Sequence, residues 1–487
     1  MKIILKNISS ARLYQSLLIS ILIFNKPVSS SAQDNHYWAQ QYGATSTLMG
    51  GAMTGGVSDN TAIYYNPGVL SFIDNTSLSV DANVYRMDKV VITDGAGSNV
   101  NLNSAQLSVY PQIISGMVNL LRESRFRFSY TMLTRNHGNL LMNARYSSGS
   151  PQPGSPEITN YVGGFDYVNQ LIEQWFGAGA GYRISDNLGL GATVFASYRG
   201  QSYQLTNYVQ EVQQVDDRNV FRTQTIDEAV KYSSFRLLAK LGLSLNTENL
   251  KLGITLTTPS IGLYGSGNVQ RENSVITVSE FASDMTNNFL IMDRKTGVRA
   301  NYRHPLSIAA GAEYMTGKSR LALSAEYYFK TNPYNLLDAA STPFVYPQAY
   351  LDSANYQPLI NNYLDVETAS KPVLNAGIGF SHELYKKLSL LLGASTDFTS
   401  YQKPESGNEL MNSLGSVDIY HLSAGLSYLQ NKQSVTLGFT YSFSPSEKVP
   451  PYTILNQNPD PVSSALISAH TYAIILGYTY YFSRTGE

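Results

Sequence analysis

Residues 235–256 read FRLLAKLGLSLNTENLKLGITL, and this stretch decides the fold. Its first part places apolar side chains at every second position: Phe235, Leu237, Ala239, Leu241, Leu243 and Leu245. After a short turn at 247–249 the alternation resumes with Leu250, Leu252, Ile254 and Leu256. Alternation with a period of two predicts two antiparallel strands with one apolar face, joined by a tight turn.

The same pattern recurs through most of the chain and predicts fourteen strands. Their expected bounds are 76–88, 103–118, 124–136, 172–184, 187–201, 230–246, 249–260, 301–316, 319–331, 370–383, 386–402, 417–430, 433–446 and 468–482. Short turns follow the even-numbered strands and long connections follow the odd-numbered ones. The long connections are expected at 89–102, 137–171, 202–229, 261–300, 332–369, 403–416 and 447–467. A soluble sandwich has no reason to sort its loops in this way, whereas an outer-membrane barrel has one short-turn rim and one long-loop rim.

The composition agrees with a barrel whose outer face meets lipid. Charged residues make up 14% of the 487 residues, against about 25% in an ordinary soluble domain. No apolar run reaches the length that a spanning helix needs. The 36 tyrosines suit the headgroup level of a membrane, since their rings are apolar and their hydroxyls polar. The fold class is therefore predicted to be all-β, a 14-stranded antiparallel transmembrane barrel.

The N-terminus predicts export. Lys2, Lys6 and Arg12 precede a short apolar core at 17–24, and small residues before Ala32 suggest cleavage there, giving a signal peptide at 1–32. Its removal takes away four basic residues and no acidic one, so the net charge falls from −1 to about −5. Nucleic acid is therefore not an expected partner. There are no cysteines, which excludes disulfides and thiolate chemistry.

Residues 33–75 precede the first strand and lack a strand pattern. They are rich in glycine and alanine, which tolerate close backbone approach, and they carry aromatic residues typical of packing. Because fourteen strands enclose a lumen wider than their own side chains fill, we expect this segment to be a hatch that plugs the barrel at 76–482. A tail at 483–487 follows the last strand, whose aromatic end at Phe482 suits insertion by the barrel-assembly machinery.

The segment 58–70, SDNTAIYYNPGVL, resembles the hatch of the FadL family of outer-membrane transporters for long-chain fatty acids and aromatic hydrocarbons. The resemblance rests on Ser58, Asp59 and Asn60, followed by Asn66 and Pro67, with Gly68 in place of the usual alanine. Combined with the strand count, it covers the expected mature chain. It implies passive diffusion of a hydrophobic small molecule through a monomeric barrel, with the hatch residues acting in gating and with no cofactor.

The family resemblance also implies release sideways into the membrane at a kink in the third strand. The pattern of that strand breaks at Asn136, His137 and Gly138, and the neighbouring Pro111 cannot donate a ladder hydrogen bond. We therefore hypothesise a wall opening between the second and third strands. An ordinary strand end with an edge bulge is the alternative.

Several charged side chains share the inward phase of their strands: Arg125, Arg127, Arg236, Lys240, Glu313 and Glu326. A cation in a water-poor lumen is suited to hold a ligand carboxylate. The alternative is a structural network of ion pairs that stiffens the barrel. The sequence alone does not choose between them.

The enzyme alternative is an outer-membrane hydrolase. The six histidines are scattered, no Gly-x-Ser-x-Gly or His-Glu-x-x-His motif occurs, and His421 beside Ser423 is the best pair available. We therefore expect no catalytic residue and no metal site. A binding or adhesion protein that captures haem or a host ligand through its loops is a further alternative. Fatty acids, aromatic hydrocarbons and haem-like compounds are all open as ligands. Outer-membrane lipid is expected as a further partner of the barrel.

Overall fold

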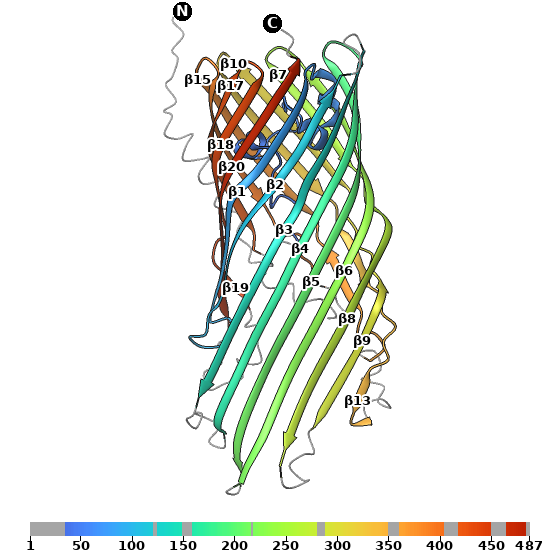
Figure 1. Ribbon diagram of the computed structural model, residues 1–487, viewed down its shortest axis with the longest axis vertical. Helices are drawn as coiled ribbons and strands as arrows, with labels where there is room; N and C mark the ends of the chain where they lie inside the picture. Colours follow the sequence, from blue (N-terminus) through green and yellow to red (C-terminus); the bar gives the residue numbers. More distant parts are fainter. Residues whose placement is uncertain are drawn as a thin grey trace, which may run out of the picture.

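The computed structural model describes residues 35–119, 124–148, 158–215, 218–279, 288–348, 360–403, 417–449 and 464–483. The expected signal peptide at 1–32 lies outside these residues, as does residue range 484–487 of the expected tail. Figure 1 shows a tall, tilted cylinder of strands whose short connections gather at one end, here called the turn end. The opposite end is called the loop end.

The strands of the first half are long. They are β1 (Thr76–Thr93), β2 (Leu102–Val118), β3 (Phe126–Ser148), β4 (Ile158–Arg183), β5 (Leu188–Val215), β6 (Arg218–Asn246), β7 (Leu250–Thr257), β8 (Ile261–Val278) and β9 (Phe289–Arg299). Those of the second half are shorter. They are β10 (Ser307–Thr316), β11 (Ser319–Tyr328), β12 (Thr331–Leu337), β13 (Phe344–Tyr346), β14 (Val366–Ser370), β15 (Val373–Tyr385), β16 (Leu388–Asp397), β17 (Ile419–Gln430), β18 (Gln433–Phe443), β19 (Glu447–Val449) and β20 (Ala465–Ser483).

These strands form a closed antiparallel barrel of fourteen positions in the described part of the chain. Closure is made by β1 and β20, which pair along nearly their whole length. Two of the fourteen positions around the wall each hold two successive strands: β7 with β8 in one, and β9 with β10 in the other. β6, for example, pairs with β7 along one part of its length and with β8 along the rest. The predicted fold class and strand number are confirmed.

The expected loops at 137–171 and 202–229 are wrong, because most of these residues are strand. β4 and β5 pair from Arg183 and Gly189 to Ile158 and Gln213, far beyond the predicted strand ends. The expected loop at 261–300 is likewise occupied largely by β8 and β9. The wall of β3 to β9 therefore continues well past the membrane toward the loop end (Figure 1).

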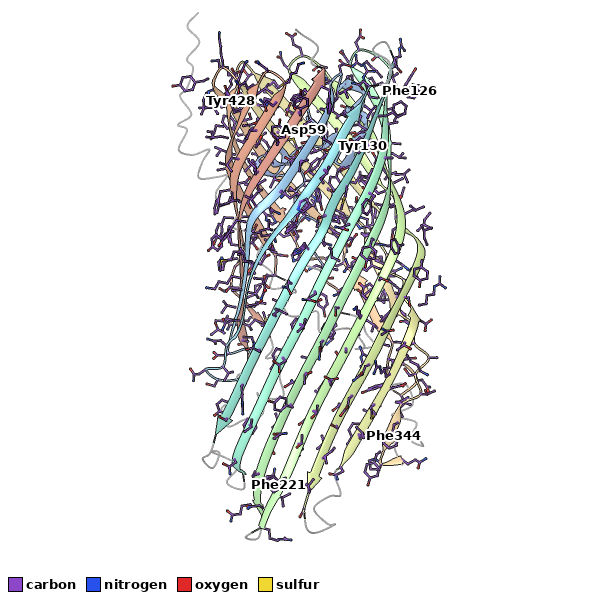
Figure 2. The ribbon with its side chains drawn as sticks, viewed as in Figure 1. Asp59, Phe126, Tyr130, Phe221, Phe344 and Tyr428 are labelled. Atoms are coloured by element: carbon purple, nitrogen blue, oxygen red, sulfur yellow. The ribbon has the colours of Figure 1, made fainter. Side chains whose placement is uncertain are left out.

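Along β5 the outer face changes from apolar near the turn end to largely polar toward the loop end, although some apolar side chains at the loop end, such as Phe221 and Phe344, are exposed. Near the turn end the outward side chains are apolar: Phe126, Tyr130 and Tyr428, labelled there in Figure 2, are all exposed. On β6 the apolar outward row runs from Leu245 to Phe235. Ten residues at about 3.3 Å each, tilted by about 40°, span about 25 Å, the height of the lipid-facing band of outer-membrane barrels. The protein is accordingly an outer-membrane barrel.

Beyond this band the apolar residues turn inward. On β5 the side chains of Tyr203, Leu205 and Val209 are buried inside the wall, while Gln204 and Gln210 lie outside. They belong to a large buried apolar cluster that we call the outer core. It includes Phe165, Tyr167, Val230, Tyr232, Val269, Ile291, Leu336, Leu337, Ile360, Tyr363, Leu364 and Ile467.

Residues 35–75, here called the N-terminal segment, lie inside the barrel near the turn end. They contain α2 (Ala44–Leu48), α3 (Ala62–Tyr65) and the 3₁₀ helix η1 (Pro67–Phe72), drawn in blue within the cylinder in Figure 1. Nearly all of their side chains are buried, and many pack with inward residues of the wall. No helix among the described residues is long and apolar enough to cross a membrane.

Glycines in the wall allow the N-terminal segment to lie against the backbone of the strands. A Cβ atom at Gly191 would stand 2.0 Å from the carbonyl oxygen of Pro67, and one at Gly253 would stand 1.9 Å from that of Thr54. Any other residue at these positions would displace the segment. The spacing of these wall glycines is therefore set by the contents of the lumen.

Candidate functional site

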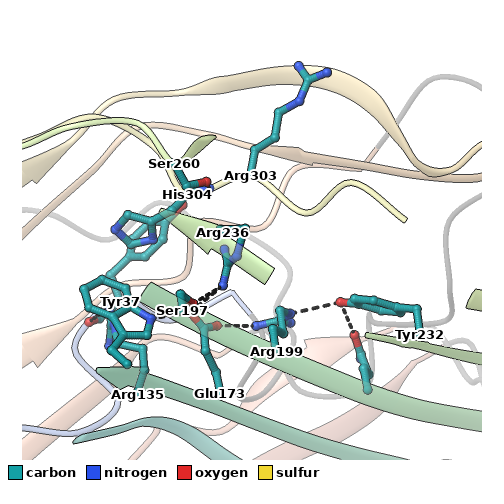
Figure 3. A network of polar contacts seen from close by, with 12 residues as sticks. Tyr37, Arg135, Glu173, Ser197, Arg199, Tyr232, Arg236, Ser260, Arg303 and His304 are labelled. Atoms are coloured by element: carbon teal, nitrogen blue, oxygen red, sulfur yellow. Dashed lines mark hydrogen bonds and ion pairs between the residues drawn. The ribbon is translucent and has the colours of Figure 1, made fainter. Parts of the chain in front are cut away.

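A buried polar network lies in the lumen between the N-terminal segment and the outer core (Figure 3). Its centre is the carboxylate of Glu173 on β4, which is 2.9 Å from the Nη1 atom of Arg199 and 2.7 Å from the Nη2 atom of Arg236. The indole of Trp175 also donates to it, at 2.7 Å. All three charged side chains are at most 3% exposed. One carboxylate thus serves two arginines from the neighbouring strands β5 and β6.

Arg236 keeps hydrogen-bonding capacity that its neighbours do not use. Its Nη2 atom donates to Glu173 and to Ser197, but its Nε and Nη1 atoms have no partner among the described residues. The ring of Tyr302 covers this guanidinium at 4.6 Å and that of Arg199 at 3.9 Å. The three N–H groups on these two nitrogens of a buried cation are therefore available to a further acceptor.

A third buried arginine joins the N-terminal segment to this network. Arg135 on β3 donates to the carbonyl oxygen of Tyr37 at 2.7 Å and to the hydroxyl of Tyr42 at 3.1 Å. Its guanidinium also lies over the ring of Trp175, at 5.6 Å. Because Trp175 contacts Glu173 as well, the start of the N-terminal segment is held directly beside the central carboxylate.

Lys240 lies below this network on β6. Its Nζ atom is 4.3 Å from the centre of the Tyr64 ring of the N-terminal segment, and no carboxylate is within ion-pair distance in the part of the chain that is described. Glu326 on β11 instead accepts hydrogen bonds from Trp38 at 3.1 Å and Ser307 at 2.6 Å.

Positive charge is therefore in excess at this level of the lumen. Four buried cations face two buried carboxylates, and their exposed fractions are all below 7%. The cations are Arg135, Arg199, Arg236 and Lys240, and the carboxylates are Glu173 and Glu326. A buried excess of cations favours an anionic group as an additional partner. We call these six residues the cation cluster.

The outer core lies directly beyond the cation cluster and is filled by a segment of the chain itself. In residues 360–366, the hydroxyl of Tyr363 donates to the carbonyl oxygen of Ile291 at 3.1 Å, and its own carbonyl oxygen accepts from Arg271 at 2.9 Å. Asp365 holds the same segment by accepting from the backbone N–H of Ala339 at 2.8 Å. Burial raises the pKa of the Asp365 carboxyl and of the Tyr363 hydroxyl. Residues 360–366 thus fill the apolar interior of the loop-end half.

The expected gating residues lie in the N-terminal segment, where Asn66 is the central one. Its Nδ2 atom donates to the carbonyl oxygens of Thr54 at 2.9 Å and of Leu243 in β6 at 3.0 Å, and its Oδ1 atom accepts from the N–H of Gly68 at 3.0 Å. Asn66 thereby ties two parts of the segment to the wall. Pro67 opens η1, the 3₁₀ helix that follows.

The other hatch residues form turns and wall contacts. Asn60 donates to the carbonyl oxygen of Ser115 in β2 and accepts from Ser77 in β1. Asp59 accepts from the N–H and hydroxyl of Thr61, and Ser58 beside it is exposed. These contacts fix the path of the segment along the wall.

The expected lumenal charges do not all come together. Only Arg236, Lys240 and Glu326 belong to the cation cluster. Glu313 pairs with Lys251 at 3.0 Å near Gly56, and Arg127 pairs with Asp74 at 2.7 Å near the turn end. Arg125 lies exposed at that rim. Glu313 therefore lies at the wall beside the N-terminal segment, and Arg125 and Arg127 lie at the turn end.

The seam between β2 and β3 has an incomplete backbone ladder. Pairing joins Ile113–Val118 to Phe128–Leu133, and among the described residues it stops there although both strands continue toward the loop end. A bulge between Thr134 and Asn136 in β3 marks this point. Beyond it, side chains bridge the strands: the ring of His137 stacks on Tyr110 at 4.5 Å.

Two more contacts across this seam come from side chains. The hydroxyl of Thr134 donates to the carbonyl oxygen of Pro111 at 2.8 Å, and the amide of Asn139 donates to that of Gln106 at 3.2 Å. A cavity of about 10 Å³ lies behind the seam, lined among others by Gln40, Arg135, His137 and Gly138. The four residues expected near a wall opening are thus gathered along one seam that adjoins the N-terminal segment.

Sequence reasoning missed Glu173, Arg199 and Arg135. A signal was present, because Arg135 shares the inward phase of Arg127, and Arg199 that of Ser197. The best histidine–serine pair is not assembled: His421 bonds to Ser442 at 2.6 Å, and Ser423 donates to the carbonyl oxygen of Leu48. No cluster of metal-binding side chains occurs in the ranges that the structure describes.

No protein-family model and no curated protein matches this sequence. Solved structures do match. The toluene transporter TodX of Pseudomonas putida aligns over 91% of this chain and 98% of its own, with 16% identity and a TM-score of 0.55.

Two further solved structures match in the same way. A FadL homologue of Pseudomonas aeruginosa aligns over 94% of this chain and 100% of its own, with 12% identity and a TM-score of 0.54. The toluene transporter TbuX of Ralstonia pickettii aligns over 92% and 100%, with 12% identity and a TM-score of 0.52. At these identities the likeness shows the fold. The chain has the barrel fold of the FadL-type channels, as its sequence resemblance predicted.

Proposed function

We propose that this protein is an outer-membrane channel for the passive uptake of hydrophobic small molecules. The observation that carries the proposal is the apolar interior of the loop-end half, which leads inward to the cation cluster. An apolar interior outside the membrane extracts an apolar molecule from water, at about 25 cal/mol per Å² of surface buried.

The proposed path begins at the outer core. A ligand displaces residues 360–366, whose apolar side chains fill the chamber in the ligand's absence. Ile360, Leu364 and Val366 are interchangeable with an acyl chain or an aromatic ring as packing partners. The ligand then meets the cation cluster under Tyr302.

The cation cluster favours amphipathic acids among the hydrophobic ligands. The unused Nε and Nη1 atoms of Arg236 are placed to donate to a carboxylate, and Lys240 has no carboxylate of its own. A long-chain fatty acid offers both an acyl chain for the outer core and an anion for this cluster. A neutral hydrocarbon, such as the toluene named for TodX and TbuX, uses only the first.

We propose that the ligand leaves sideways through the β2–β3 seam. The alternative route leads past the N-terminal segment into a hollow of about 410 Å³ at the turn end, lined by Asp59, Asp81, Arg320, Glu383 and Lys387. An apolar molecule gains nothing from such surroundings. The end of the seam nearest the turn end, at Thr134 and Pro111, adjoins the lipid-facing band, so a ligand that leaves there passes into acyl chains without entering water.

The N-terminal segment acts as the hatch in this proposal. Asn66, with its three hydrogen bonds, and Pro67 hold it across the lumen, and the contact of Arg135 with Tyr37 couples its start to the cation cluster. A ligand anion that engages Arg236 competes for the same group of charges. Movement of the segment near Gln40 would then open the small cavity behind the seam.

The test is uptake by cells that lack their own channels for hydrophobic compounds. We expect this chain to support saturable uptake of radiolabelled oleate without turnover of the ligand. The double variant Arg236→Ala with Lys240→Ala should lower oleate uptake at least about five-fold, the effect of losing about 1 kcal/mol of charge-assisted binding, while toluene uptake stays unchanged.

The matched control is Lys318→Ala with Lys432→Ala, which removes two exposed cations at the turn end. Equal uptake of oleate by the wild type and the Arg236/Lys240 variant, in a barrel that is heat-modifiable and folded, would remove the carboxylate role. Absence of uptake of every hydrophobic probe would remove the channel. Hydrolysis of an ester substrate by the purified protein would favour the enzyme alternative.

A further inference from the structure

A large hollow lies on the outside of the barrel and not in its lumen. It measures about 680 Å³ and crosses the wall from β3 to β8. Figure 1 shows that these strands bend between the turn end and the loop end. We call this hollow the wall trough.

The strand register shows that the trough faces outward. Its floor follows two outward rows, and one of them joins His137, Ile172, Gly200, Ser233 and Ser266 across five neighbouring strands. A Cβ atom at Gly200 would meet the hydroxyl of Tyr198 and the methyl of Ile172, both on the outer face, at 3.1 and 3.8 Å. Small residues in the first row, glycine and serine, leave the space open.

The trough lies at the border of the lipid-facing band that is nearer the loop end. On β6 that band ends at Phe235, and the next outward residues are Ser233 and Lys231, both of which line the trough. On β5 the corresponding change runs from Tyr198 to Ser202. Since the band below it is about 25 Å tall, the trough stands at the headgroup level of the outer leaflet.

Hydrogen-bond donors line the trough, and several have no partner. The hydroxyls of Ser202, Ser233 and Ser266 make no hydrogen bond within the described ranges. Lys231 is exposed and has no ion-pair partner there. The carboxylate of Asp227, further out on the same strand, is already bound by Thr206 at 2.7 Å and Gln270 at 3.3 Å.

A second cation stands at the rim. Arg299 on β9 pairs in register with Ser266 of the trough, is exposed, and has no ion-pair partner in the described residues. The trough thus offers Lys231, several hydroxyls without partners among the described residues, and a wall of Tyr198 and Ile172 that meets acyl chains, and Arg299 stands beside it on the next strand. This combination is complementary to a phosphorylated sugar that carries acyl chains.

We propose that the wall trough binds the phosphorylated saccharide headgroup of an outer-leaflet glycolipid. The phosphate contacts Lys231 and Arg299, the sugar hydroxyls contact Ser202 and Ser233, and the acyl chains descend along Ile172 and Tyr198. This site is independent of the lumen and of the transported ligand. It also borders the β2–β3 seam at His137, so the bound lipid stands next to the proposed exit.

The experiment uses the full-length protein purified in a neutral maltoside detergent and titrated with bis-phosphorylated lipid A, with binding read by native mass spectrometry. We expect saturable binding of one lipid to the wild type. Lys231→Ala with Arg299→Ala should weaken it about ten-fold, since each exposed ion pair contributes up to about 1 kcal/mol. Ser233→Leu, which fills the trough without changing its charge, should weaken it as well.

Lys89→Ala is the matched control, because it removes another exposed cation from the outer face, on β1 outside the trough. It should bind lipid A as the wild type does. Lipid A without phosphates and phosphatidylglycerol are the comparison probes, and both should bind at least five-fold more weakly. The proposal is overturned if the trough variants bind like the wild type, or if either comparison probe binds as tightly.

Discussion

The half of β5 near the turn end and its half near the loop end have the same alternation of inward and outward side chains but opposite polarity. Near the turn end Leu190 and Val194 face outward, with 48% and 54% of their surface exposed, while Thr193 and Ser197 are buried within. Toward the loop end Leu205 is buried within while Gln204 lies outside. The geometry is continuous, and only the solvent on each side has changed.

This comparison shows where the apolar surface of the molecule is used. In the membrane half, the bilayer covers it, and the lumen is polar because hydrogen bonds must hold the N-terminal segment in place. In the loop-end half, water lies outside and the apolar residues gather within. The cation cluster stands at the border: on β5 the inward row runs from Arg199 through the polar Gln201 to the apolar Tyr203.

The largest effect is expected from removing the central carboxylate of the cation cluster at this border. Glu173→Ala removes the carboxylate that pairs with both Arg199 and Arg236, which leaves the buried guanidinium of Arg236 without a carboxylate partner among the described residues. We expect the free energy of unfolding to fall by about 3–5 kcal/mol. Urea unfolding in detergent micelles measures this, with Asp186→Ala at an exposed turn as the control. A loss no larger than in the control would show that Glu173 does not stabilise the buried arginines.

The second prediction places the same charge on the outer face of each half. Leu241→Arg puts a cation in the lipid-facing band, whereas Gln204→Arg puts one on the outer face toward the loop end. We expect the first to destabilise the barrel in lipid vesicles by about 2–4 kcal/mol. The second should change stability by less than about 0.5 kcal/mol. Similar losses for both would contradict the proposed position of the membrane border.

The third prediction concerns the inner face. Leu205→Ala removes a side chain that is 1% exposed in the outer core, and it should cost about 2–3 kcal/mol because residues 360–366 can close part of the cavity. Gln204→Ala, its outward neighbour, should be nearly neutral. Unfolding midpoints of the two variants compare them directly. A neutral Leu205→Ala would mean that the chamber is already hydrated.

The smallest effect is expected within the lumen of the membrane half. Asn66→Ala removes three hydrogen bonds of the N-terminal segment, and the loss should be about 1–2 kcal/mol because each buried hydrogen bond contributes only modestly to stability. Planar-bilayer recordings should then show current steps that the wild type lacks. Silent membranes with a folded Asn66→Ala barrel would argue against a gating role for this residue.

The membrane half was readable from sequence because its outward row is apolar without interruption. The alternation at 235–256 predicted the strands, the short turn and the lipid-facing face, as Leu241 and Ile254 show with exposures of 46% and 55%. Hydrocarbon on one side and a wet lumen on the other make this pattern strong. The number of strands followed from it.

The loop-end half was misread because its polarity reverses at Gly200. From there the outward row is Ser202, Gln204 and Thr206, residues that are also typical of loops. The inward row, with Tyr203 and Leu205, is apolar, but no spanning length marks it as strand. The reversal itself was therefore read as the end of β5.

The cation cluster was found only in part, because its partners come from separate strands. Arg236 and Lys240 were visible as inward charges on one strand. Their pairing with Glu173 and Tyr64 depends on the register of three strands and on the path of the N-terminal segment, which the pattern of a single strand does not contain. Charge alone cannot say which carboxylate lies opposite.

The central claim is that ligand crosses the lumen and leaves through the β2–β3 seam, and one measurement tests it most directly. The chain has no cysteine, so Gln106→Cys with Asn139→Cys can be joined across the seam by a short thiol-reactive crosslinker with a reducible bond. Ser389→Cys with Ser427→Cys, a pair within an intact ladder between β16 and β17, is the control. We predict that oleate uptake falls at least about ten-fold in the crosslinked seam, recovers on reduction, and is unchanged in the control. Undiminished uptake through the crosslinked seam would contradict the account.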